Sequence, residues 1–485
     1  MTELDILLVY PPLSVDERYG QRDVGDVGGH LPPLGILSLA AVLRNEGYSV
    51  DVIDSLINGW GLEEVNKYIG EKKPKVIGLS AITPIFHRAV ECADSIKKKF
   101  PDTLILLGGH HVTIMSEEDR KRYKCFDIGV VGEGEVTIIE LMKSLKQEKY
   151  DQKAFLHNYK KLKNIDGIYF HKDGEIEVTK TRALIKDLDS LPFPARDFVP
   201  IEKYIPLPNQ YKRKPVVHMV VIRGCPYNCS FCSNNAIFGR KIRARSPKKV
   251  VDEISTLKKR YGAREISFWD DMMTTNKDWM NEFCDDLIGR NVDITWTCYA
   301  RADSVTKPLL QKMREAGCWN IFFGFESGDQ QLLDNINKGI TLADIRNANR
   351  WCKEVGIEVR ASFMIALPGE TPELGQKTID FAKELNPEYA QFCITTPYPG
   401  TKLFDDAEKW GSKSIDYSKY NCWEPVFIPH GYQNKEQIAK LEKKANRDFY
   451  FRPKTIINLL LHLRSWEDVK RYFKGFRFLL GFMKK

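Results

Sequence analysis

Val216-Val-His-Met-Val-Val-Ile-Arg-Gly-Cys-Pro-Tyr-Asn-Cys-Ser-Phe-Cys-Ser233 is the stretch that decides the fold, because an apolar strand runs directly into three closely spaced cysteines. The predicted strand covers Val216–Ile222, and Cys225, Cys229 and Cys232 follow it in the pattern C-x3-C-x2-C. Three thiolates on one short loop can hold three irons of a cubic [4Fe–4S] cluster and leave the fourth iron open. A cluster that only carries electrons normally takes four cysteines, so the missing ligand indicates chemistry at the open iron.

Other interpretations of these cysteines fit less well. Tetrahedral zinc takes four ligands, usually as two C-x2-C pairs, and no second pair lies nearby. Disulfide frameworks belong to small secreted domains, whereas this chain has 485 residues and begins without a signal-peptide pattern. A purely structural or redox role also remains an alternative, but the spacing favours the cluster.

Composition predicts an intracellular, multidomain globular protein. A chain of 485 residues exceeds one hydrophobic core, so two or three domains are expected. The net charge of +8 is small for this length and does not indicate nucleic acid binding, which needs positive charge concentrated on one face. Eight further cysteines are scattered without pairing logic, and no apolar run approaches the roughly 20 residues of a membrane span. These features predict a reducing, cytoplasmic location.

Residues 1–150 alternate apolar strands with amphipathic helices. Strands that are apolar throughout, joined by short helical crossovers, predict a doubly wound parallel sheet of the Rossmann type. Ligands of such sheets bind beyond the carboxyl ends of the strands. Two glycine-rich loops stand there, Gly108-Gly109 and Gly132-Glu133-Gly134, as a bulky cofactor would require, although glycines after strands also form plain turns. No G-x-G-x-x-G motif opens the first helix, which disfavours a dinucleotide.

The rest of the chain divides into three predicted parts. Residues 151–214 form a connector with a β-hairpin, residues 215–400 hold six β/α units, and residues 401–485 form a helical C-terminal region. Six units predict a partial (β/α)6 barrel of the TIM type, open at one side. Catalytic and binding residues of such barrels stand at the carboxyl ends of the strands, where the cysteine loop follows the first strand.

Polar side chains follow the other strands of the predicted barrel. Asp270 and Asp271 end the second strand, Arg301 the third, and Glu326 with Ser327 the fourth. The paired carboxylates could act as acid and base, or they could orient a cationic ligand. Arg301 is expected to pair with a carboxylate of cofactor or substrate, with a surface salt bridge as the alternative.

The motif C-x3-C-x-Φ-C, with Phe231 as its aromatic residue, resembles the signature of the radical S-adenosylmethionine (radical SAM) superfamily. The resemblance implies that Cys225, Cys229 and Cys232 hold a [4Fe–4S] cluster whose open iron binds S-adenosylmethionine, which is then split to a 5′-deoxyadenosyl radical. It also assigns five side chains to S-adenosylmethionine: Phe231 at the adenine, Asp270 and Asp271 at the methionyl amino group, and Glu326 and Ser327 at the ribose and carboxylate.

Residues 1–150, taken with the cluster motif, resemble the cobalamin-binding domain of cobalamin-dependent radical SAM proteins. Pro11-Pro12, Pro32-Pro33-Leu34-Gly35, Gly108-Gly109 and Gly132-Glu133-Gly134-Glu135 carry this resemblance, which implies a cobalamin site at the glycine loops. The D-x-H-x-x-G motif, whose histidine ligates cobalt in other cobalamin proteins, is absent. The radical branch commonly lacks it too, and a scaffold domain without cobalamin is the alternative.

These resemblances imply an enzyme that functionalises an unactivated carbon, by cobalamin-dependent methyl transfer. A radical cyclase or carbon–carbon coupling enzyme acting on a lipid or isoprenoid is one alternative, and a non-catalytic iron–sulfur protein is another. The implied partners are a small-molecule or lipid substrate and an external electron donor of the flavodoxin or ferredoxin type, without nucleic acid. Aromatic and basic residues in Phe449–Lys454, Ile456–Leu463 and Arg471–Lys485 predict either peripheral membrane contact or helices that cap the barrel.

Overall fold

The computed structural model describes residues 4–14, 17, 19, 20, 28–455, 457 and 466–484. It divides into two compact units. The first is drawn from Met1–Arg18, Pro32–Lys203 and Ser233–Gly239, and the second from Tyr19–Leu31, Tyr204–Cys232 and Arg240–Lys485. The predicted connector 151–214 therefore contributes to both units.

The first unit contains a seven-stranded sheet within the described residues, in the order β2-β1-β3-β4-β5-β6-β7. The strands are β1 (Ile6–Tyr10), β2 (Val50–Asp54), β3 (Val76–Ser80), β4 (Leu104–Gly108), β5 (Ile128–Val130), β6 (Ile168–Lys172) and β7 (Glu175–Val178). β1 to β5 are parallel, which confirms the doubly wound sheet. The hairpin predicted in the connector is β6–β7, and it extends this sheet because β6 pairs antiparallel with β5.

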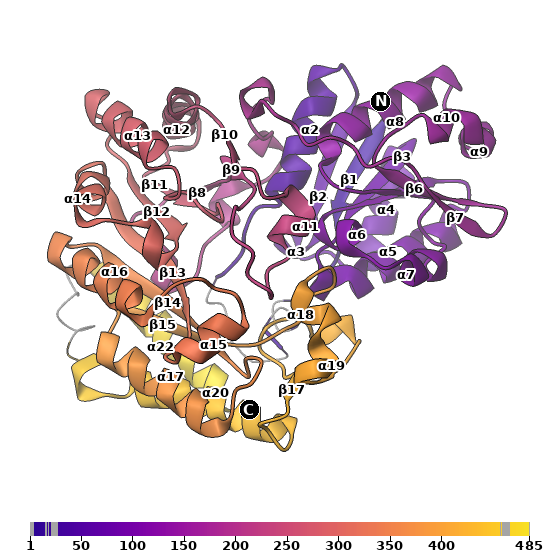
Figure 1. Cartoon of the computed structure of the whole chain (residues 1–485). Coiled ribbons are helices and arrows are strands. Elements are labelled where there is room, and N and C mark those ends of the chain that lie inside the picture. The colour runs from indigo at the N-terminus through magenta and orange to yellow at the C-terminus, as the bar shows by residue number, and fades with distance from the viewer. Residues whose placement is uncertain are drawn as a thin grey trace. The chain divides into compact units, whose positions relative to one another are not determined.

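Helices cover both faces of this sheet (Figure 1). They are α2 (Leu34–Asn45), α3 (Ser55–Asn58), α4 (Leu62–Lys72), α5 (Phe86–Lys99), α6 (His110–Ile114), α7 (Glu117–Arg122), α8 (Gly134–Gln147), α9 (Gln152–His157), α10 (Tyr159–Lys163) and α11 (Asn234–Phe238). α2 packs with α8, and α4 packs with α5 on the other side of the sheet. Burial on both faces explains why β1, β3 and β4 are apolar throughout.

The second unit contains a six-stranded parallel sheet in the order β15-β14-β13-β12-β11-β8 within the described residues. Its strands are β8 (Val216–Met219), β11 (Glu265–Phe268), β12 (Thr295–Ala300), β13 (Cys318–Glu326), β14 (Glu358–Ile365) and β15 (Tyr389–Ile394). Sequential neighbours pair while the two ends stay unpaired with each other, so the partial barrel is confirmed.

Helices cover the outer face of this barrel. They are α12 (Pro247–Tyr261), α13 (Lys277–Gly289), α14 (Lys307–Glu315), α15 (Gln330–Asn335), α16 (Leu342–Val355) and α17 (Pro372–Leu385). Outward-facing side chains such as Phe268, Trp296 and Phe363 are buried completely beneath them. The inner face carries the alternate residues, among them one row in which Phe322 of β13 stands beside Arg360 of β14.

The predicted first strand, Val216–Ile222, is wrong in its second half. β8 ends at Met219, and a separate short strand, β9 (Ile222–Arg223), pairs antiparallel with β10 (Arg243–Ala244). The backbone turns away because the Asp270 carboxylate accepts hydrogen bonds from the N–H groups of Val221 and Ile222, at 2.6 and 2.5 Å.

The C-terminal region is helical, as predicted, with additional short elements. The helices are α18 (Lys402–Asp405), α19 (Ala407–Trp410), α20 (Lys435–Tyr450) and α22 (Trp466–Lys484), and the short strands are β16 (Gly411–Lys413) and β17 (Phe427–Pro429). α20 lies beside α17 (Figure 1). The Tyr450 hydroxyl donates to the Ala390 carbonyl at 2.7 Å and accepts from the Ala390 N–H at 3.2 Å, which covers the free edge of β15.

None of the helices described is both long and apolar enough to span a bilayer. Of the predicted stretch Ile456–Leu463, only Ile457 falls within the described residues.

Candidate active site

The cysteine loop follows β9 at the carboxyl end of the barrel strands. Its Gly224 has a φ of +90°, a left-handed conformation that favours glycine at the turn into the loop. The Cys225 and Cys229 side chains are half-buried and Cys232 is exposed, and none of the three forms a disulfide among the described residues. The Cys232 N–H donates to the Cys229 carbonyl at 3.2 Å, so the last two cysteines share one turn.

Three hydrogen bonds tie this loop to the barrel rim. The Ser230 N–H donates to the Ile336 carbonyl at 2.9 Å, and the Leu403 N–H donates to the Ser230 carbonyl at 2.8 Å. The Asn337 side-chain amide donates to the Asn228 carbonyl at 2.8 Å. The loop is thus held by segments that are far away in sequence. No local sequence pattern predicts these contacts.

Phe231 lies inward from the loop, on an apolar patch at the barrel rim. Its ring packs against Leu332, Ile336, Met364 and Leu367. These residues belong to or follow α15 and β14, so the aromatic position of the motif anchors the loop and also forms part of the wall beside the cysteines.

Arg301 is itself buried next to the cysteines, and its ion-pair partner Asp303 is an exposed residue. Its guanidinium pairs with Asp303 at 2.9 and 3.1 Å, and its carbon Cζ stands 3.6 Å from the centre of the Tyr227 ring. Its Nη1 donates to the Cys229 sulfur at 3.7 Å. The structure therefore brings a fixed positive charge to the cysteine loop.

Asp270 and Asp271 differ in environment. Asp270 is buried, and one of its oxygens is occupied by the backbone of Val221 and Ile222. Burial raises the pKa of Asp270 to about 7, against the lowering effect of those two hydrogen bonds. Its other oxygen has no hydrogen-bond partner among the described residues. Asp271 is exposed, so it is the more accessible of the two carboxylates.

Glu326 is the last residue of β13 and Ser327 follows it, and their side chains make different contacts. Glu326 has a φ of +62° at a β-bulge and forms a buried ion pair with Lys338, at 2.7 Å. The Lys338 ammonium also stands 5.6 Å from the centre of the Phe231 ring, which connects this pair to the cysteine loop. Ser327 is buried completely, contacts the Thr378 hydroxyl at 3.1 Å and accepts from the Asp329 N–H at 3.1 Å. Its hydroxyl therefore holds backbone and helix α17 in place.

Glu370 lies after β14, in the Leu367–Thr371 stretch. Its carboxylate accepts from the Ala366 N–H at 2.7 Å, the Leu367 N–H at 3.3 Å and the Tyr432 hydroxyl at 2.5 Å. Burial raises the pKa of Glu370 to about 7. The Glu370 carboxylate therefore fixes the backbone at the start of this loop.

The glycine loops of the first unit lie at the carboxyl ends of β4 and β5. At Gly108 and Gly132, no heavy atom of the described residues comes within 4 Å of the position that a Cβ would take, apart from the chain neighbours. Gly109 has a φ of +99°, and a Cβ there would stand 2.5 Å from the Ala81 carbonyl oxygen. Gly134 is the first residue of α8, and a Cβ there would stand 3.2 Å from the Leu39 side chain. The loops therefore combine enforced turns with open space where a large planar ligand could approach the backbone.

Glu133 and His111 are both buried. The Glu133 carboxylate accepts from the Ile185 N–H at 2.7 Å. The His111 ring is buried completely, with its Nδ1 3.1 Å from the Thr83 hydroxyl, and burial lowers its pKa to about 4.

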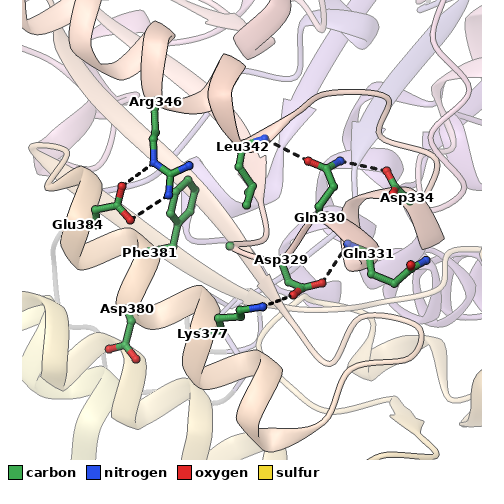
Figure 2. A pocket seen from close by; sticks show the side chains of 11 residues that line it. Asp329, Gln330, Gln331, Asp334, Leu342, Arg346, Lys377, Asp380, Phe381 and Glu384 are labelled. Atoms are coloured by element: carbon green, nitrogen blue, oxygen red, sulfur yellow. Dashed lines mark hydrogen bonds and ion pairs between the residues drawn. The ribbon is translucent and has the colours of Figure 1, made fainter.

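A pocket of about 640 Å³ lies elsewhere, on the outer side of the barrel (Figure 2). Its lining comes from α15, α16, α17 and the segment before α15, and it includes the pairs Arg346–Glu384 and Lys377–Asp329. It contains no cysteine and none of the barrel's inward-facing residues, so it is separate from the cysteine loop.

The described side chains of the cysteine loop are not arranged to hold a single metal ion. No three His, Cys, Asp or Glu side chains of the described residues converge on a point where one metal ion could be held. A [4Fe–4S] cluster takes one thiolate for each iron, so its ligands stand farther apart than those of one ion. Three cysteines on one anchored loop beside a buried arginine fit such a cluster.

An open β/α barrel with three cysteines after its first strand, joined to a doubly wound domain with glycine loops, defines the class of radical SAM proteins that carry a cobalamin domain. The model of the radical SAM superfamily matches residues 219–382, and the model of the B12 binding domain matches residues 22–142. The chain belongs to this family. It is an enzyme class that uses a [4Fe–4S] cluster, S-adenosylmethionine and cobalamin, as predicted from the sequence.

Three relatives define the similarity. A protein of Pyrococcus horikoshii, named as an uncharacterized methyltransferase, is 34% identical over 476 residues, which is 98% of each chain. An anaerobic magnesium-protoporphyrin IX monomethyl ester cyclase of Rubrivivax gelatinosus is 32% identical and covers 87% of this chain and 75% of that protein. The solved structure of the radical SAM methyltransferase TsrM from Kitasatospora setae, with cobalamin and a [4Fe–4S] cluster bound, aligns over 99% of both chains with a TM-score of 0.70 at 16% identity, a likeness of fold.

Proposed function

We propose that this chain is a cobalamin-dependent methyltransferase that acts on an unactivated carbon. The observation that carries the proposal is the loop of three cysteines, which is tied to the barrel rim by three hydrogen bonds and contacts the buried Arg301 through Cys229. When bound, the reduced cluster supplies the electron that splits S-adenosylmethionine to a 5′-deoxyadenosyl radical, and cobalamin supplies the methyl group. The protein contributes binding, orientation and exclusion of water.

Cys225, Cys229 and Cys232 would ligate three irons and leave the fourth to S-adenosylmethionine. Arg301 would balance the negative charge of the ligated thiolates, because its guanidinium already lies at the Cys229 sulfur. Its partner Asp303 holds the guanidinium in that orientation.

Five other residues would shape the S-adenosylmethionine site. Phe231 would offer a flat apolar surface to the adenine, and exposed Asp271 would accept from the methionyl amino group. Asp270 and Ser327 would act indirectly, since their contacts hold the backbone beside the loop. Glu326 would orient the ribose or carboxylate contacts together with its buried partner Lys338.

Cobalamin would lie against the glycine loops of the first unit. The open space at Gly108 and Gly132, the enforced turn at Gly109 and the helix start at Gly134 support this, and Glu133 would fix the second loop through Ile185. No cobalt-ligating histidine is assigned.

The test is anaerobic reconstitution with iron, sulfide, hydroxocobalamin and S-adenosylmethionine, followed by addition of a low-potential reductant and product analysis. A methyltransferase forms S-adenosylhomocysteine together with 5′-deoxyadenosine, and Cys229→Ala should lose both products by at least about 100-fold. Cys125→Ala, a half-buried cysteine of the first unit, serves as the matched control. A Cys229→Ala protein with full iron content and full product yield would refute the assignment.

A cyclase is the second candidate, favoured by the similarity to the Rubrivivax gelatinosus cyclase. In that case 5′-deoxyadenosine would appear without S-adenosylhomocysteine. The same product analysis therefore separates the two functions.

Two partners complete the proposal. A flavodoxin or ferredoxin would supply the electron, because the described residues include no second set of clustered cysteines. Helix α22 would touch a membrane surface, since Val469, Phe473 and Phe476 form an exposed apolar stripe flanked by exposed Lys470, Lys474 and Arg477.

A further inference from the structure

Arg360 is a buried guanidinium on the inner face of the barrel. Its side chain belongs to β14, and the residue is only 3% exposed. Among the described residues, no carboxylate lies within 4 Å of its guanidinium nitrogens, whereas buried Arg301 and Lys338 each pair with a carboxylate.

Two neighbouring side chains hold the guanidinium. Nε donates to the Asn320 side-chain oxygen at 2.7 Å, and the Tyr299 side chain is a further hydrogen-bond partner. Asn320 is buried completely, and its own amide nitrogen has no acceptor among the described residues. A buried amide donor without an acceptor thus lies beside a guanidinium without a carboxylate partner, at one place inside the barrel.

Aromatic rings form the rest of this place. The Arg360 guanidinium carbon stands 5.1 Å from the centre of the Phe322 ring and 5.9 Å from that of Tyr299. Tyr299 lies 4.9 Å from Phe322 and 5.4 Å from Trp269, centre to centre. All three rings are half-buried, so they remain accessible from the barrel interior.

The charge is only partly compensated by these rings. Aromatic faces attract a cation, but they do not replace the counter-charge that a buried ion needs. Burial accordingly lowers the pKa of Arg360. A bidentate carboxylate would supply the missing counter-charge.

We propose that Arg360 and Asn320, with Trp269, Tyr299 and Phe322, form the substrate anchor of the barrel, and that the substrate is a carboxylic acid with a flat, conjugated or aromatic body. The guanidinium and the Asn320 amide bind the carboxylate, and the rings stack on the body. This assignment rests on the proposed function, because it names the substrate class of the same barrel.

Binding of 1-naphthoate and of its neutral analogue 1-naphthamide tests the anchor, by equilibrium dialysis against the reconstituted protein saturated with S-adenosylmethionine. The wild type should bind naphthoate at least tenfold more tightly than naphthamide. Arg360→Met should remove this preference, and Arg360→Lys should keep part of it. Arg346→Met, which removes an outer-helix cation paired with Glu384, should keep all of it.

Equal binding of the two probes by the wild type would overturn the proposal, whether or not Arg360→Met folds. An unchanged preference in folded Arg360→Met would overturn it as well. S-adenosylmethionine cleavage by the wild type is measured separately, so a protein that binds naphthoate without cleaving S-adenosylmethionine would contradict the proposed function and leave the anchor standing.

Discussion

Arg301 is the side chain whose surroundings say most about the cysteine loop. Its guanidinium forms an ion pair with the exposed Asp303, as one of the alternatives predicted from the sequence allows. It also contacts the Tyr227 ring and the Cys229 sulfur. Such outer contacts tune a metal site without ligating it.

Replacing Arg301 should therefore weaken the cluster. Arg301→Met keeps the length and apolar body of the side chain but removes the charge, and we expect retention of iron against a chelator to fall about 10- to 100-fold. Iron per chain is measured after anaerobic challenge and desalting. Arg290→Met, which removes an exposed ion pair with Asp252 and Asp286, is the control. Equal iron retention by both variants would show that Arg301 has no such role.

Local and distant determinants explain what could be predicted at this scale. The cysteine spacing is a property of one loop, so the sequence displayed it directly. The contacts of Asp270 depend on Val221, 49 residues away, and those of Ser327 depend on Thr378, 51 residues away. Whether such a side chain faces a ligand or the backbone is decided by tertiary contacts that periodicity does not encode.

At the scale of elements, the strands and helices of both units follow from their apolar patterns. The predicted Val216–Ile222 strand failed where a buried carboxylate competes for its N–H groups, and propensity cannot report that competition. The β6–β7 hairpin was predicted, but its membership of the first sheet was not, because pairing with β5 joins residues about 40 positions apart.

Helix α22 makes its own prediction. Phe473 is 62% exposed and Phe476 49% exposed, and three cations flank them. Co-sedimentation with vesicles containing anionic phosphatidylglycerol should exceed that with phosphatidylcholine alone. The double variant Phe473→Ser/Phe476→Ser should bind the anionic vesicles at least tenfold less, since each ring contributes up to about 2 kcal/mol of apolar burial.

Val178→Ser, which alters an exposed apolar residue of β7, is the control for this experiment. Absence of wild-type binding to anionic vesicles would contradict membrane contact. The helix would then serve to cover the barrel, through its packing against α20 and η5 (Pro208–Gln210).

At the scale of the molecule, two units with separate cores supply different parts of one chemistry. The first presents open glycine loops, and the second presents the cysteine loop and an inner face with polar and aromatic residues. Both folds were predictable because each repeats a simple β/α pattern. The substrate class was not predictable from the sequence, because the substrate anchor around Arg360 is assembled from single residues of separate strands.

The proposed reaction depends on one iron of the cluster that has no protein ligand and binds S-adenosylmethionine. The most direct measurement is the Mössbauer spectrum of wild-type protein reconstituted with ⁵⁷Fe, recorded before and after addition of S-adenosylmethionine. We predict a [4Fe–4S] spectrum in which one iron of the four changes its parameters when S-adenosylmethionine binds. A spectrum that S-adenosylmethionine leaves unchanged, or one that shows no four-iron cluster, would contradict the account.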